Sequence, residues 1–176
     1  NEVKGQIVQE KGTANLFPIW NENGTKIAYL SNQDHDYFSS TDLFIYDLAT
    51  EESKKIAKGV NAKPTWNGQS IYYSKRANLP NKVGSKYYDI YESKKESRIT
   101  RDARGFSPVF SLSDSSLFYL STKDGTQNIF KINLKSKSTE KLTSYNNQEI
   151  ISGLNYDVTK NRLIYDMTTN HFKDIH

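Results

Sequence analysis

A phased repeat of about 45 residues constrains the fold of this chain more than any other feature. Three segments, residues 17–31, 63–74 and 107–121, share proline, one residue, an aromatic, a polar turn and an apolar strand ending in serine. Their prolines, Pro18, Pro64 and Pro108, are spaced 46 and 44 residues apart. A weaker fourth copy has Leu154 at the proline position, 46 residues further on. Self-similarity at this period is typical of propeller blades.

The second half of each unit recurs as well. Matching strands cover residues 42–47, 89–91 and 128–133, and each is followed by a polar turn and another strand. Four strands in about 45 residues is the size of one blade. We therefore predict an all-β fold, a β-propeller of about four four-stranded antiparallel blades with almost no helix. The alternative is a β-sandwich, but a sandwich does not require a motif at a fixed phase.

The repeat sets the expected domain organisation, a single propeller domain or segment over residues 1–176. Residues 1–12 resemble the last strand of a preceding blade, and the blades are expected at 13–58, 59–101 and 102–144, with an incomplete blade at 145–176. Two models follow. The N-terminal strand closes a four-bladed ring, or the chain is a piece of a larger propeller. The second model predicts exposed blade edges, and self-association through them is possible.

The first copy carries the clearest family signature. It reads Pro18-Ile19-Trp20-Asn21-Glu22-Asn23-Gly24, then Ile27-Ala28-Tyr29. It resembles the TolB-like (WD-type) propeller repeat, Pro-x-Trp-Ser-Pro-Asp-Gly, although Asn21 and Glu22 replace Ser-Pro. The resemblance extends over nearly the whole chain and implies a fragment of a larger propeller. Related propellers occur in periplasmic assembly proteins, as gating domains of prolyl-oligopeptidase-like enzymes and in polysaccharide lyases.

Composition excludes several kinds of chemistry. There is no cysteine, so disulfides and thiolate sites are excluded, and no Gly-x-Ser-x-Gly elbow or Gly-rich phosphate loop occurs. The net charge is +4, but the basic residues are scattered among 20 acidic ones, which does not favour a nucleic-acid partner. The apolar runs are too short to span a membrane. We expect no cofactor and no catalytic residues.

Candidate binding residues follow from the loop lengths. Successive strands alternate in direction, so the loop between the second and third strands shares a face with the connectors between blades. The extra residues lie on that face, at 32–41 and 75–88, although simple drift in loop length is the alternative. The second insertion reads as a basic, polar loop suited to carboxylates or sugars, with candidates Lys75, Arg76, Asn78, Lys82 and Lys86. On a connector lie Arg101, Asp102 and Arg104; Arg101 or Arg104 could reach the central channel, or Asp102 pairs with a neighbouring arginine.

Two further groups of residues have alternative interpretations. Asp34, Asp36 and Asp42, with His35, are the one cluster of metal-ligand types, but they lack the glycine and distal glutamate of an EF-hand loop. A structural loop is the alternative to a metal site. Trp20, Trp66 and Phe110 are candidates for stacking on a ligand, but at blade spacing we expect core residues wedged between blades.

The sequence thus predicts a non-catalytic propeller scaffold that mediates protein–protein interaction, in the bacterial cell envelope or periplasm. The alternative is a substrate-gating propeller domain of a larger prolyl-oligopeptidase-like peptidase or polysaccharide lyase. A carbohydrate ligand is also possible. The fold alone does not choose between these roles.

Overall fold

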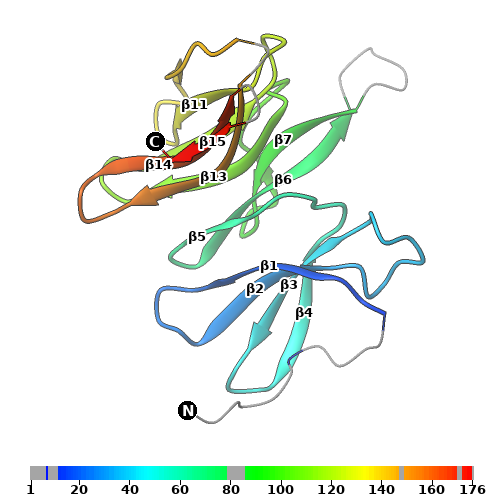
Figure 1. The fold of residues 1–176 in the computed structure, drawn as a ribbon. Helices are drawn as coiled ribbons and strands as arrows, with labels where there is room; N and C mark the ends of the chain where they lie inside the picture. The colour runs from blue at the N-terminus through cyan, green and yellow to red at the C-terminus, as the bar shows by residue number, and fades with distance from the viewer. Residues whose placement is uncertain (1–6, 8–11, 79–85, 147–148, 170–171, 176) are drawn as a thin grey trace.

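Four antiparallel sheets, one after another along the chain, make up the computed structural model (Figure 1). It describes residue 7 and residues 12–78, 86–146, 149–169 and 172–175, with backbone alone at 78, 86 and 172–174. The first sheet contains β1 (Asn15–Trp20), β2 (Lys26–Ser31), β3 (Asp42–Asp47) and β4 (Glu52–Ala57). The second contains β5 (Thr65–Asn67), β6 (Ser70–Asn78), β7 (Lys86–Glu92) and β8 (Ser97–Arg98).

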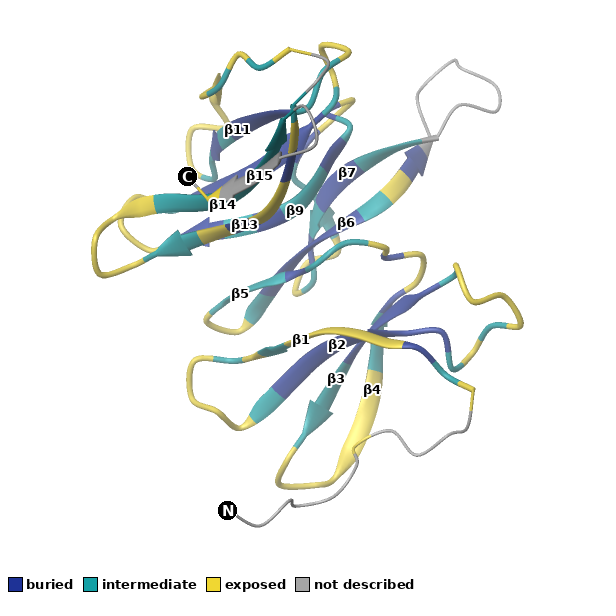
Figure 2. Ribbon diagram, viewed as in Figure 1, coloured by how far each residue is buried: buried dark blue, intermediate teal, exposed yellow. Residues whose placement is uncertain are grey.

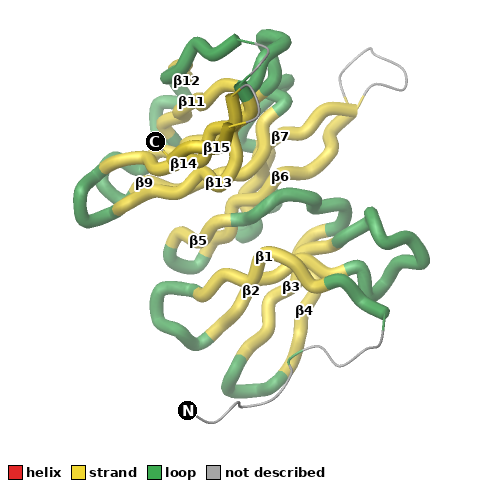
Figure 3. The backbone as a smooth tube through the Cα atoms, viewed as in Figure 1, coloured by secondary structure: helices red, strands yellow, loops and turns green. Residues whose placement is uncertain are grey.

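The third and fourth sheets repeat the arrangement. The third contains β9 (Gly105–Ser111), β10 (Ser116–Ser121), β11 (Asn128–Asn133) and β12 (Thr139–Lys141). The fourth has three described strands, β13 (Ile150–Asp157), β14 (Arg162–Thr169) and β15 (Phe172–Ile175). Within each sheet the strands follow chain order, and Figure 3 shows strands and loops without helix over the described residues. The predicted all-β propeller of separate blades is confirmed.

The first strand of every sheet lies toward a common axis. Strand β1 contacts β5, β5 contacts β9, and β9 contacts β13. A hollow of about 290 Å³ is lined by residues of all four strands and of the segment before β5, among them Ile19, Pro64, Pro108 and Tyr156. Lys63 Nζ donates to Asn155 Oδ1 at 2.8 Å and so links the second blade to the fourth. These contacts give the radial arrangement of a partial propeller.

Packing between blades accounts for the core. Side chains alternate along a strand, so an inner blade buries both of its faces. In β10, Leu117 and Tyr119 pack toward the second blade, whereas Phe118 and Leu120 pack toward the fourth. Figure 2 shows the resulting buried residues along the middle strands of the first three sheets.

The repeated aromatic residue explains how successive blades fit together. Trp66 packs into the cluster of the first blade and donates its Nε1–H to the Ile19 carbonyl at 3.2 Å. Phe110 stacks on Tyr72 of the second blade, and Tyr156 stacks on Phe118 of the third. Each aromatic therefore lies against the preceding sheet.

Trp20 departs from the prediction that all three aromatics are core residues. Its side chain is 57% exposed, compared with 9% for Phe110. The reason follows from the packing rule, because the described residues include no sheet before the first blade for Trp20 to lie against. The predicted N-terminal strand falls in residues 1–12, nearly all of which lie outside the described part of the chain.

Candidate functional site

Loops on one side of the blades form the surface that we call the connector face. It comprises the β2–β3 loop (residues 32–41), the outer ends of β6 and β7, the β10–β11 loop (residues 122–127) and the connectors 58–64 and 99–104. In Figure 1 the β2–β3 loop and the outer ends of β6 and β7 project to the right, whereas the β1–β2 and β13–β14 turns point to the left. The alternation of strand direction produces this separation.

The second insertion is an extended hairpin rather than the basic loop that the sequence suggested. Lys75, Arg76 and Asn78 lie on β6, and Lys86 lies on β7, directly opposite Asn78. Tyrosines explain the difference: Tyr87 and Tyr88 pair across the ladder with Ala77 and Arg76, and aromatic residues favour strands. Lys82 lies outside the described residues.

Two of these basic side chains lie over tyrosine rings. The Lys75 ammonium is 6.0 Å from the centroid of the Tyr91 ring. The Arg76 guanidinium lies 5.5 Å from the Tyr88 ring, and its Nε–H donates to the Tyr88 hydroxyl at 3.2 Å. Such contacts orient a cation without neutralising it, so both charges stay available to an anionic group.

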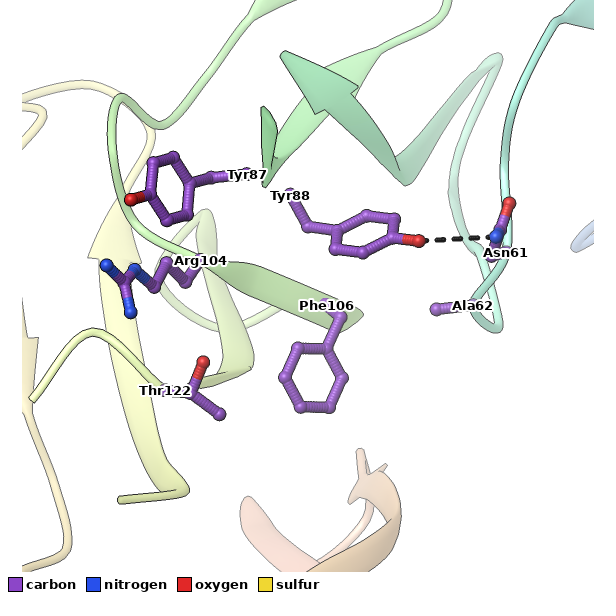
Figure 4. A pocket seen from close by; sticks show the side chains of 7 residues that line it. All are labelled: Asn61, Ala62, Tyr87, Tyr88, Arg104, Phe106 and Thr122. Carbon is purple, nitrogen blue, oxygen red and sulfur yellow. Dashed lines mark hydrogen bonds between the residues drawn. The ribbon is translucent and has the colours of Figure 1, made fainter. Parts of the chain in front are cut away.

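A cavity of about 450 Å³ opens on this face between the second and third blades (Figure 4). Its walls combine aromatic and polar groups: Asn61, Ala62, Tyr87, Tyr88, Arg104, Phe106 and Thr122. The Arg104 guanidinium lies 4.3 Å from the centroid of the Tyr87 ring. The Asn61 side-chain amide donates to the Tyr88 hydroxyl at 3.2 Å. A mostly apolar wall beside a cation suits a ligand that carries both an apolar group and a carboxylate or hydroxyls.

The connector that carries Arg104 is held in place from within the second blade. Asp89, fully buried, accepts hydrogen bonds from the backbone N–H of Asp102 at 3.2 Å and of Ala103 at 3.0 Å. It also accepts the Thr100 hydroxyl at 2.9 Å and forms an ion pair with Arg98. Asp102 and Arg104 both have positive φ, a conformation that is unfavourable for non-glycine residues. Arg101 lines a different cavity from Arg104.

The same device recurs in the other complete blades. Asp42 and Asn128 occupy the first position of β3 and β11, and both are as buried as Asp89 in the middle of β7. Asp42 accepts the Gly59 N–H at 2.9 Å, and Asn128 accepts the Tyr145 N–H at 2.7 Å. A buried oxygen on the third strand therefore fixes each connector. The Asp/Asp/Asn recurrence is visible in the sequence, from which Asp42 was predicted only as a candidate metal ligand.

In the candidate metal cluster, Asp34 and Asp42 form ion pairs with a lysine, and Asp42 also contacts a histidine. The Lys55 ammonium lies 2.8 Å from Asp42 Oδ2 and also pairs with Asp34, and His35 Nε2 is 3.0 Å from Asp42 Oδ1. Asp36 is exposed. Among the described residues no group of three or more His, Cys, Asp or Glu side chains is arranged to hold a metal. Burial raises the pKa of the Asp42 carboxyl, but Lys55, the Gly59 N–H and His35 outweigh burial and lower it overall.

Two aromatic side chains at the tip of the β2–β3 loop escaped the sequence reasoning. Tyr37 is 76% exposed and Phe38 is 73% exposed. Two local turns shape the loop, because the His35 N–H donates to the Asn32 carbonyl at 2.8 Å and the Ser40 N–H donates to the Tyr37 carbonyl at 3.1 Å. Two adjacent aromatic residues in an otherwise polar insertion are the sequence signal for this site.

The architecture of this chain is similar to that of several proteins of known structure. The chain matches TolB from Acinetobacter baumannii with a TM-score of 0.65 and 16% identity over 96% of this chain and 44% of that one. It matches a putative TolB from Agrobacterium tumefaciens with a TM-score of 0.57 and 14% identity, over 89% of this chain and 62% of that one. This is a TolB-like β-propeller fold. The chain spans less than two thirds of the length of either TolB.

The TolB-like fold is shared by proteins with different roles. A puromycin-hydrolysing peptidase from Mycobacterium tuberculosis matches with a TM-score of 0.60 and 13% identity, over 89% of this chain and 28% of that one. No family model and no curated protein matches the sequence. At these identities the comparisons establish the fold but not the function. No helix in the described part of the chain has the length and apolar character needed to cross a membrane.

Proposed function

We propose that this chain is a non-catalytic propeller scaffold that binds a protein partner through its connector face, in the bacterial cell envelope. The observation that carries the proposal is the exposed pair Tyr37 and Phe38 on a loop with a fixed base. The envelope location and the protein partner draw support from the likeness to TolB, and the partner's identity follows from neither.

Aromatic residues of this kind are the usual source of binding energy at protein interfaces. Tyrosine is enriched at interface hot spots, and large aromatics supply contact area with few rotatable bonds. The ion pairs of Lys55 with Asp34 and Asp42 lie beneath the loop and fix its base. Less ordering is then needed on binding, and ordering is one of the main costs of association.

A photo-crosslinking experiment tests this proposal. A benzophenone photo-crosslinker is placed at position 38. The control position is 112 in the β9–β10 turn of the third blade, where Leu112 is also exposed but lies on the side opposite the connector face. We expect position 38, and not position 112, to capture a discrete envelope protein. Its affinity, measured with purified components, should fall about 30-fold or more in Tyr37→Ala/Phe38→Ala, and stay unchanged in Leu112→Ala. Identical captures from both positions, or equal affinities, contradict the proposal.

A second candidate role is a substrate-gating propeller domain of a larger peptidase or lyase. The observation in its favour is the cavity beside Arg104 and Tyr87, since a gating domain needs a surface that meets small ligands. Under this hypothesis Arg104→Ala, and not Tyr37→Ala/Phe38→Ala, alters function. Activity of the full-length gene product toward short peptides or oligogalacturonides measures the difference. The carbohydrate alternative predicts glycan-array binding that Arg104→Ala removes.

A further inference from the structure

A second cavity, of about 450 Å³, lies between the second and third blades on the other side of connector 99–104. We call it the outer groove, and it runs from Arg101 and Lys123 on the connector face to Lys137 and Thr139 at the β11–β12 turn. No residue of the first or fourth sheet lines it. It is therefore separate from the aromatic loop tip on which the proposed function rests.

The outer groove exists because β8 is short. Strand β8 covers Ser97–Arg98, whereas the equivalent β4 of the first blade has six residues. The second sheet therefore stops before it covers the outer half of the third. Tyr119, Phe130 and Ile132 are left as the floor of the groove, buried within the blade interface but lining the hollow. An apolar floor of this kind suits an aliphatic or aromatic group.

The rim of the outer groove is basic. Arg101, Lys123 and Lys137 are exposed, and none of them forms an ion pair within the described part of the chain. A fourth cation, Arg98, is already paired with Asp89. No Asp or Glu side chain lines the cavity. Several cations around a low-dielectric hollow concentrate positive potential there and favour an anionic occupant.

We propose that the outer groove binds an acidic peptide segment of a partner protein, with one bulky apolar side chain on the floor and carboxylates at the three cations. Charge complementarity selects the acidic character, and the floor selects the apolar side chain. Thr139 belongs to β12, the edge strand of its sheet, so an extended segment can lie alongside it.

The test uses the peptide Ac-Glu-Asp-Phe-Asp-Glu-amide and an amide ¹⁵N–¹H titration of the chain. We expect saturable shifts at the amides of residues 98–103, 121–123 and 137–139. Affinity should fall about tenfold in the triple variant Arg101→Gln/Lys123→Gln/Lys137→Gln. The charge-matched control Lys54→Gln/Lys58→Gln/Lys160→Gln, altered at exposed lysines elsewhere, should bind as the unaltered chain does. A peptide with serine in place of phenylalanine should bind the unaltered chain more weakly than the phenylalanine peptide does.

Several outcomes overturn the proposal. The absence of shifts up to about 2 mM peptide does so, since affinity weaker than this is not specific. Equal binding by the triple variant, or by a Gln/Asn version of the peptide, shows that charge plays no part. If inorganic polyphosphate shifts the same amides and the serine peptide binds as well as the phenylalanine peptide, the groove is a general anion patch. None of these results depends on the loop that carries Tyr37 and Phe38.

Discussion

Removal of the buried carboxylate of Asp89 tests the proposed basis of connector geometry. Asp89→Ala takes away the acceptor for the Thr100 hydroxyl and for the Asp102 and Ala103 N–H groups, and leaves the Arg98 guanidinium without its counter-ion. Breaking one side of a buried ion pair costs about 3–5 kcal/mol, because the remaining charge and donors lose their partners. We expect a loss of about 4 kcal/mol, a large part of the stability of a typical domain.

The side-chain amide of asparagine should do less damage at this position. The third blade already uses Asn128 there, whose amide oxygen accepts the Thr143 hydroxyl and the Tyr145 N–H. Asp89→Asn keeps one such oxygen, but it leaves Arg98 without an opposite charge. Its cost should therefore be smaller, about 2 kcal/mol.

Urea unfolding followed by tryptophan fluorescence measures these differences. With a slope of about 2 kcal/mol per molar, Asp89→Ala should move the midpoint down by about 2 M. Asp124→Ala is the control, since it removes an exposed partner of Lys141 and should cost less than about 1 kcal/mol. Equal shifts for Asp89→Ala and Asp124→Ala would refute the reasoning, because the buried acceptor would then contribute no more than a surface ion pair.

Two other predictions concern stability. Trp66→Ala should lower the free energy of unfolding by about 3 kcal/mol and Trp20→Ala by less than about 1 kcal/mol, because of these two residues only Trp66 packs against a preceding sheet. Thermal melting of both variants measures the difference, and similar melting temperatures would contradict the packing rule. The lowered pKa of Asp42 stabilises the fold above the pKa of about 3.8 that it has when unfolded, and this contribution is lost as the pH falls through the folded-state pKa. Urea midpoints between pH 6 and about 2 should therefore fall less steeply in Asp42→Asn than in the unaltered chain, and parallel curves would count against it.

The propeller fold was predictable because its signal is a period. Proline, aromatic and serine positions recur at a spacing that one blade imposes, and the turn residues agree with it. Each blade buries its apolar faces against neighbouring blades, so the pattern of core residues recurs several times along the sequence. The exposure of Trp20 was not predictable in the same way, since it depends on what lies next to the first blade rather than on any local pattern.

The site was less accessible from sequence, for physical reasons. Lys75 and Arg76 look like loop residues because they are polar, but cross-strand partners at Tyr87 and Tyr88 extend the hairpin through them. The pairing of Asp89 with Arg98 could have been found by alignment of the repeat, since Asp42 pairs with Lys55 at the equivalent positions. In the third blade the neutral Asn128 replaces the acid, and Lys141 pairs with Asp124 instead.

The way each first-strand aromatic lies against the sheet before it gives the array a direction. The two ends of a row of blades therefore differ. One end presents an exposed first-strand aromatic residue, as Trp20 does, and the other presents the sheet face on which the next blade would pack such a residue. A further sheet, whether from the same polypeptide or from another copy, can join only head to tail. A two-fold contact between identical ends would place two such aromatic residues against each other. Further blades are therefore added in the same direction around the axis as the existing ones.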